Sequence, residues 1–135
     1  MIKIVDVLLY RCSVVFLIES TLEEWKTFFD EQYKDNKLQS SNDADVREMF
    51  EDNTSGFVIS TGLNDYICYI SNSENAGLVA HEIFHAANAV LQGRGVTLDS
   101  SGEAYAYMIE YLTNEFYNII NEEESDANDE SKTTK

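Results

Sequence analysis

The chain has 135 residues, 44% of them hydrophobic and 12% aromatic, which is enough for one folded domain with a single core. Its formal net charge of −16 disfavours binding to the phosphates of nucleic acids. No apolar run reaches the roughly 18 residues that a transmembrane helix needs, so a membrane span is not expected.

Two further features bear on the compartment. The apolar runs near the N-terminus are broken by charged residues, and no small-residue cleavage site follows a basic start, so a signal peptide is not expected. Cys12 and Cys68 each lie within an apolar, strand-like run, which is typical of buried free thiols. We therefore expect a cytoplasmic protein, because reducing compartments keep such thiols free.

The first third of the chain predicts two strands and a helix. Residues 1–10 and 12–19 are rich in β-branched and aromatic side chains, as two strands or one long bent strand would be. Thr21 and Glu24 have the spacing of a capping box. The helix that they predict, over residues 22–33, carries an apolar stripe on one side. Its members are Leu22, Trp25, Phe28, Phe29 and Tyr33.

The middle of the chain predicts a short helix followed by a hairpin. Residues 34–42 are polar and predict a loop, and residues 43–51 predict a helix with Val46, Met49 and Phe50 turned inward. A turn cluster at 52–56 precedes two strands, at 57–60 and 66–70, that read as a hairpin.

Two longer helices and an acidic segment follow. Ser73 is a candidate N-cap for a helix over 74–92, which Gly93 and Gly95 terminate. A second helix is predicted over 102–120. Residues 122–135 contain no large apolar side chain and predict a disordered acidic tail, so one domain over 1–121 is expected. The order of elements predicts an α+β fold, with a small antiparallel or mixed sheet packed on helices.

The sequence His81-Glu82-Ile83-Phe84-His85 lies within the first of these two helices. Residues four apart on a helix share one side, so His81 and His85 can bind one zinc ion. The glutamate between them would then lie beside a zinc-bound water, where it can act as a base. The motif therefore predicts two zinc ligands and a catalytic Glu82.

A catalytic zinc site needs a third protein ligand, and the chain has no third histidine. Glu103 is the leading candidate, because the last helix would return towards the middle of the motif helix. Ser100 and Glu103 also fit a capping box, so ligand and cap remain alternatives. Asp99 and Glu110 are competing ligands. Helical projection puts Glu103 and the histidines on polar faces that either meet at a metal or both face water.

Two tyrosines could help to stabilise an oxyanion. Tyr107 lies one turn beyond Glu103, and Tyr105 is close by in the sequence. A phenol hydroxyl can donate a hydrogen bond to a developing negative charge. The alternative for both side chains is packing in the core or at its rim.

The motif followed by Glu103 resembles the gluzincin group of zinc metallopeptidases, and residues 79–112 are similar to small zincin-like proteins encoded by bacteriophages and prophages. The resemblance implies that His81, His85 and Glu103 bind zinc and that Glu82 is the general base. It implies a peptide or protein substrate.

Three functions are therefore compatible with the sequence. The first is a zinc-dependent peptidase, in which the strand at 66–70 could lie at a sheet edge and align an extended substrate. The second is a zincin-like binding or structural protein that holds the metal without cleaving peptides. The third is an acidic interaction module in which the motif is incidental.

Overall fold

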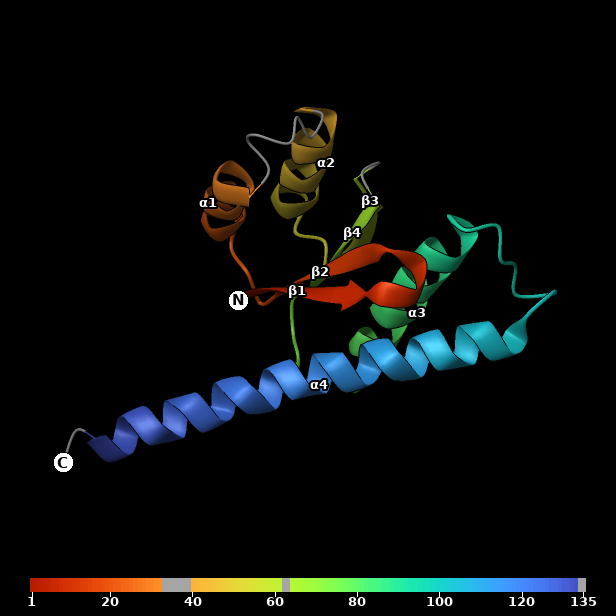
Figure 1. Cartoon of the computed structure of the whole chain (residues 1–135). Helices are drawn as coiled ribbons and strands as arrows, with labels where there is room; N and C mark the ends of the chain where they lie inside the picture. The colour runs from red at the N-terminus through yellow and green to blue at the C-terminus, as the bar shows by residue number, and fades with distance from the viewer. Residues whose placement is uncertain (33–39, 62–63, 134–135) are drawn as a thin grey trace.

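A computed structural model describes residues 1–32, 40–61 and 64–133 of the chain (Figure 1). Within them the chain forms four strands, four α-helices and one turn of 3-10 helix, labelled η1. In chain order the elements are β1 (Ile2–Val7), η1 (Leu8–Tyr10), β2 (Cys12–Ile18), α1 (Leu22–Gln32), α2 (Ser40–Glu51), β3 (Gly56–Ser60), β4 (Asp65–Ile70), α3 (Ala76–Gln92) and α4 (Gly102–Thr133).

The four strands form one mixed sheet in the order β1-β2-β4-β3. β1 and β2 are antiparallel, β2 and β4 are parallel, and β3 and β4 form the antiparallel hairpin that the sequence predicts. The parallel pair requires a crossover connection, and α1, α2 and β3 provide it. The fold is therefore α+β with a mixed sheet, as predicted.

The expectation that the strand at residues 66–70 lies at a sheet edge is wrong. β4 pairs with β2 on one side and with β3 on the other, so it is central, and β3 is the edge strand. The burial of β4 explains this, because Ile67, Cys68 and Ile70 are fully buried on the two faces of the sheet. A strand that is apolar on both faces belongs inside the sheet.

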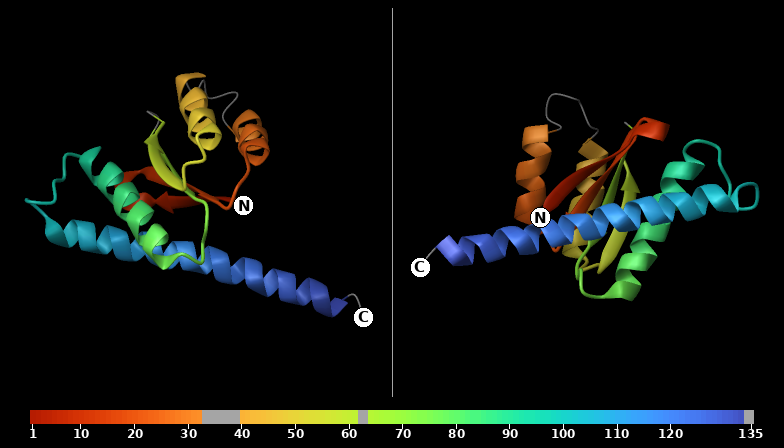
Figure 2. Two further views of the ribbon diagram at one scale, coloured as in Figure 1. Left: turned by 180° about the vertical axis from the view of Figure 1, so that it is seen from behind. Right: turned by 60° about the horizontal axis from the view of Figure 1, so that its bottom comes forward.

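Helices cover both faces of the sheet (Figures 1 and 2). α1 and α2 pack on one face, where Trp25 and Val46 join a buried cluster with Val15, Leu17 and Ile67. The indole Nε1 of Trp25 donates a hydrogen bond of 2.9 Å to Asp43, which ties the two helices together. Tyr33 and most of the predicted loop at 34–42 lie outside the described residues, and α2 begins at Ser40, earlier than predicted.

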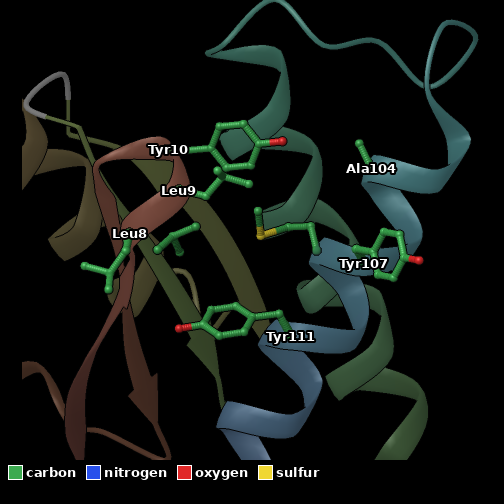
Figure 3. Close-up of a pocket in the computed structure, with 8 residues that line it drawn as sticks. Leu8, Leu9, Tyr10, Ala104, Tyr107 and Tyr111 are labelled. Atoms are coloured by element: carbon green, nitrogen blue, oxygen red, sulfur yellow. The ribbon is translucent and has the colours of Figure 1, made fainter.

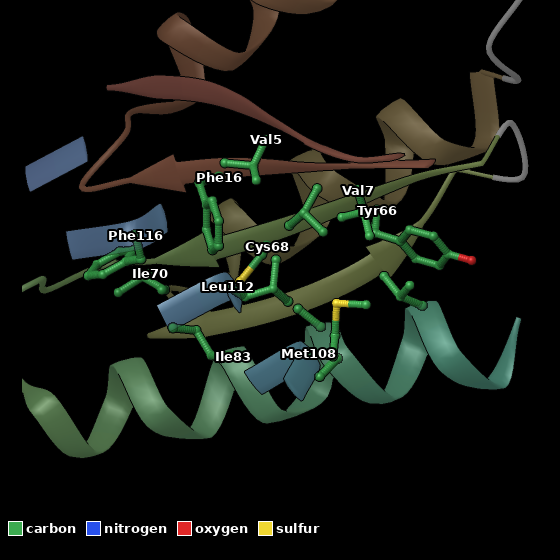
Figure 4. Close-up of a cluster of buried hydrophobic side chains, with 14 of the residues drawn as sticks. Val5, Val7, Phe16, Tyr66, Cys68, Ile70, Ile83, Met108, Leu112 and Phe116 are labelled. Atoms are coloured by element: carbon green, nitrogen blue, oxygen red, sulfur yellow. The ribbon is translucent and has the colours of Figure 1, made fainter. Parts of the chain in front are cut away.

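α3 and α4 pack on the other face and bury the larger cluster (Figure 4). Phe16 of β2 meets Phe116 of α4 edge-to-face, with ring centroids 5.7 Å apart. The buried side of α4 is the apolar face that helical projection predicts. Its buried members are Tyr105, Met108, Leu112, Phe116 and Ile119.

The helix starts follow the sequence only in part. Thr21 and Glu24 form the predicted capping box, since Thr21 Oγ1 accepts from Glu24 N at 3.1 Å. The N-cap of α3 is Asn75, whose side chain accepts from Leu78 N at 3.1 Å, and not Ser73. Ser73 instead donates its N–H and hydroxyl to Glu19. Because α3 begins at Ala76, Asn75 is the residue directly before its first turn.

α4 extends well beyond its predicted end. The helix continues to Thr133, so residues 122–133 are helical where the sequence predicts a disordered tail. No glycine or proline interrupts this segment. Every side chain from residue 122 to residue 130 is exposed, so this part of α4 lies outside the core.

Both cysteines are buried and free, as predicted. Burial raises the pKa of the Cys68 thiol far above its ordinary value, so it behaves as a small apolar side chain. Across the described ranges, no helix combines the length and apolar content that crossing a bilayer requires.

Candidate metal centre

The two histidines of the motif converge on the outward side of α3. Their Nε2 atoms are 3.2 Å apart, and the ring centroids are 4.7 Å apart. Both side chains are exposed, because the buried side of α3 is formed by other residues, among them Val79, Ile83 and Ala86. One turn of helix separates His81 from His85, which explains why the rings meet.

Glu82 lies at the border between this outward side and the core. It is only 4% exposed, although its neighbours His81 and His85 are open to solvent. Its carboxylate Oε1 is 3.8 Å from Nε2 of His81. Burial raises the pKa of the Glu82 carboxyl, and the two nearby imidazoles oppose that shift.

Gly56, the first residue of β3, makes room for this carboxylate. A Cβ atom built on Gly56 would lie 2.6 Å from Glu82 Oε1 and 2.7 Å from Cδ and Cγ. No real side chain tolerates such contacts, so any larger residue at this position has to displace Glu82. A glycine at a strand end often marks a close approach of this kind. The sequence predicts a turn cluster at Gly56 but does not predict this role.

The free edge of β3 lies beside Glu82. Ser55 bonds Ser71, and Thr61 bonds Asp65, so the odd-numbered residues of β3 face β4. The N–H and C=O groups of Gly56, Val58 and Ser60 therefore point away from the sheet. An extended peptide could pair with them, which assigns to β3 the role that the sequence reading gave to β4.

The histidine pair fits a zinc ion. Two Zn–N bonds of about 2.0–2.1 Å in a tetrahedral arrangement place the nitrogens about 3.3–3.4 Å apart. The observed separation of 3.2 Å is close to this value. The same distance also suits one imidazole N–H donating to the other ring.

Glu103 does not lie with the histidines. Among the described residues, no three His, Cys, Asp or Glu side chains are grouped closely enough to hold a metal. Tyr105, two residues after Glu103, bonds Asn88, which follows His85 on α3. The start of α4 is thus held at the residues of α3 that follow the motif, and α4 runs from there back past the start of α3 (Figure 2).

The two competing ligands do not join the histidines either, and the predicted capping box of α4 is not formed. Asp99 and Glu110 are exposed and belong to no such group with the histidines within the described chain. Ser100 does not cap α4 with Glu103, because its hydroxyl bonds Thr97 and the helix begins only at Gly102. The polar faces of α3 and α4 both face solvent, which is one of the two arrangements that helical projection allows.

The two tyrosines have separate roles. The buried Tyr105 donates its hydroxyl to Asn88 at 3.0 Å and lies 3.2 Å from the carbonyl oxygen of Val96. Tyr107 is 68% exposed and lines a pocket that α4 forms with η1. No hydrogen bond or ion pair within the described ranges joins Tyr107 to Glu82 or to either histidine.

Comparison with protein-family models, with curated proteins and with solved structures finds no match for this chain. The candidate site therefore rests on three residues that the structure brings together, His81, Glu82 and His85, and on the strand that adjoins them.

Proposed function

We propose that the chain is a zinc-dependent hydrolase that cleaves a peptide bond, with His81 and His85 as metal ligands and Glu82 as general base. The observation that carries the proposal is the convergence of the two Nε2 atoms, 3.2 Å apart, beside a buried carboxylate. Histidine nitrogens at this spacing are a donor set that zinc prefers.

Each residue then has a defined task. Bound zinc supplies Lewis-acid chemistry, polarising a carbonyl and lowering the pKa of a water. Glu82 accepts the proton of the attacking water and passes it to the leaving amine. The absence of a side chain at Gly56 leaves the space that the Glu82 carboxylate occupies, and its burial limits how far it can move. The outward N–H and C=O groups of β3 would align an extended substrate alongside.

Glu103 remains our proposed third ligand. It would have to move towards the histidines to bind the same cation, because it forms no group with them within the described residues. Comparison of Glu103→Ala with Asp99→Ala and Glu110→Ala tests this assignment. We expect Glu103→Ala alone to weaken zinc binding by at least about tenfold. Equal binding by all three variants would remove Glu103 from the site.

The second candidate is a protein that binds metal without cleaving peptides. It is favoured by one observation, namely that no third ligand joins the pair among the described residues. Such a site would hold the cation through two imidazoles and solvent. Zinc would then order the exposed side of α3 without hydrolysis.

Glu82→Gln separates the two candidates. The substitution keeps the shape of the side chain but removes the base, so a peptidase should keep its zinc and lose hydrolysis by a factor of about 10² or more. Glu110→Gln is the matched control, because it changes an exposed carboxylate outside the motif and should leave cleavage unchanged. A wild-type protein that binds zinc yet cleaves nothing in a broad library of quenched fluorescent peptides supports the second candidate.

A further inference from the structure

A concave site lies between η1 and α4, at the β1 edge of the sheet. We name it the η1–α4 pocket and define it by Leu8, Leu9 and Tyr10 on one wall and Ala104, Tyr107 and Tyr111 on the other (Figure 3). Its volume is about 560 Å³, within the range of ordinary ligand sites. It adjoins β1, whereas Glu82 adjoins β3, and these strands are the two opposite edges of the sheet.

The lining is apolar and unusually exposed. Leu8 is 83% exposed, Leu9 is 84% exposed and Tyr107 is 68% exposed. The polar atoms of the six defining side chains are the three tyrosine hydroxyls. Single exposed apolar side chains are common, but a group of them around a cavity marks an interaction site.

Both walls are held in place by hydrogen bonds. The guanidinium of Arg94 donates to the carbonyl oxygen of Tyr10 through Nε at 3.0 Å and Nη2 at 2.8 Å. On the other wall, the hydroxyl of Tyr111 donates to the carbonyl oxygen of Asp6 at 2.6 Å. The pocket is thus formed before any ligand arrives, so binding does not have to order it.

The surroundings of the pocket are acidic. A smaller groove of about 380 Å³ shares Leu8 and Tyr111 with the pocket and lies between β1 and α4, and it carries Asp6, Glu115 and Glu122 against one lysine. A third hollow beside Leu8 carries Asp6 and Asp65 against one arginine. Acidic groups therefore line two hollows that share Leu8 with the apolar pocket.

We propose that the η1–α4 pocket binds an apolar anchor of a cationic protein segment, whose lysine or arginine side chains lie along the acidic groove. Charge complementarity selects this occupant. A second copy of the chain carries the same net charge of −16 and is repelled, and a fatty acid would bring its carboxylate against Asp6, Glu115 and Glu122. The tyrosine rings also offer faces to cationic side chains.

The test uses the full chain and synthetic peptides of eleven residues. The first peptide has a central leucine-phenylalanine pair flanked by lysines, the second replaces the lysines by glutamates, and the third replaces the apolar pair by serines. We expect only the first to bind, with amide shifts at residues 8–10 and 104–111 in NMR spectra. Its affinity should fall at least about fivefold between about 50 and about 300 mM salt.

Surface variants locate the binding. Leu9→Ser and Tyr107→Ser should each lower the affinity for the first peptide by about tenfold. Both substitutions change exposed side chains, so circular dichroism should show that folding is retained. Leu98→Ser is the matched control, because Leu98 is 53% exposed and does not line the pocket. Its affinity should equal that of the wild type.

Several results would overturn the proposal. They are equal binding of the glutamate peptide, undiminished binding by Leu9→Ser and Tyr107→Ser, and the absence of any binding up to about millimolar peptide. Self-association through these residues, or binding of a fatty acid without binding of the lysine peptide, would also overturn it. None of these outcomes depends on zinc, so the proposal stands or falls separately from the proposed hydrolase.

Discussion

Substitution of Gly56 by alanine should displace the Glu82 carboxylate. The added Cβ would lie 2.6 Å from Oε1 and 2.7 Å from Cδ and Cγ, whereas unstrained contacts need about 3.5 Å. The side chain of Glu82 therefore has to move by about 1 Å, or β3 has to shift away from α3. Over-packing of this kind costs about 1–3 kcal/mol of unfolding free energy. A misplacement of about 1 Å can cost a catalytic group about 10²-fold in rate.

Thermal and denaturant unfolding of a double-mutant cycle measures the energetic coupling between Gly56 and Glu82 directly. Gly56→Ala should be destabilised in the presence of Glu82, and much less when Glu82→Ala removes the clashing atoms, with a coupling free energy of about 1–3 kcal/mol. Gly102→Ala is the control, because a Cβ there meets nothing within 4 Å, and its stability should be unchanged or higher. If the cycle is additive, or if Gly56→Ala hydrolyses peptides like the wild type, the assignment of Gly56 as the residue that positions Glu82 is wrong.

Three further predictions concern the fold. The N–H and hydroxyl of Ser73 hold the pKa of Glu19 below its ordinary value of 4.5, so ionised Glu19 stabilises the fold above that pH. Because the group is exposed, Glu19→Gln should cost only about 0.5 kcal/mol at pH 7, and urea titrations should show this difference vanish as the pH falls through the lowered pKa. Removal of residues 124–135 should change the Tm by less than about 2 °C in calorimetry, since the side chains of residues 124–130 are exposed; a drop of about ten degrees would contradict that view. Trp25→Phe loses the bond to Asp43 and leaves a small cavity, so we expect a loss of about 1–3 kcal/mol in chemical denaturation, and an unchanged value would mean that α1 contributes little.

Hydrophobic patterning predicts most of the fold. The β-branched runs before Thr21 form β1 and β2, the turn cluster before Phe57 precedes a hairpin, and the spacing of Tyr105, Met108, Leu112 and Phe116 predicts which side of α4 is buried. Hydrophobic patterning does not predict the order of the strands, because apolar content does not determine which strands pair. β4 and β3 both read as hairpin strands, and only the parallel pairing of β2 with β4 makes β3 the edge.

The sequence likewise predicts only part of the candidate site. Helical spacing predicts that His81 and His85 meet, because both lie on one element. Contacts between elements do not follow from spacing, since they depend on how α3 sits against α4 and β3. For this reason the sequence predicts neither the close approach of Glu82 to Gly56 nor the separation of Glu103 from the histidines. The same limit applies to Tyr107. The sequence gives its position along α4 but not whether it faces α3 or η1, and in the structure it lines the pocket with η1.

The most direct test of the metal centre is calorimetric titration of zinc into metal-free protein at neutral pH. The proposal predicts one zinc per chain, binding weakened by at least about a hundredfold in His81→Ala and in His85→Ala, and binding retained in Glu82→Gln. No uptake of zinc by the wild-type chain, or equal uptake after loss of either histidine, would contradict the assignment of a metal site to His81 and His85 on α3.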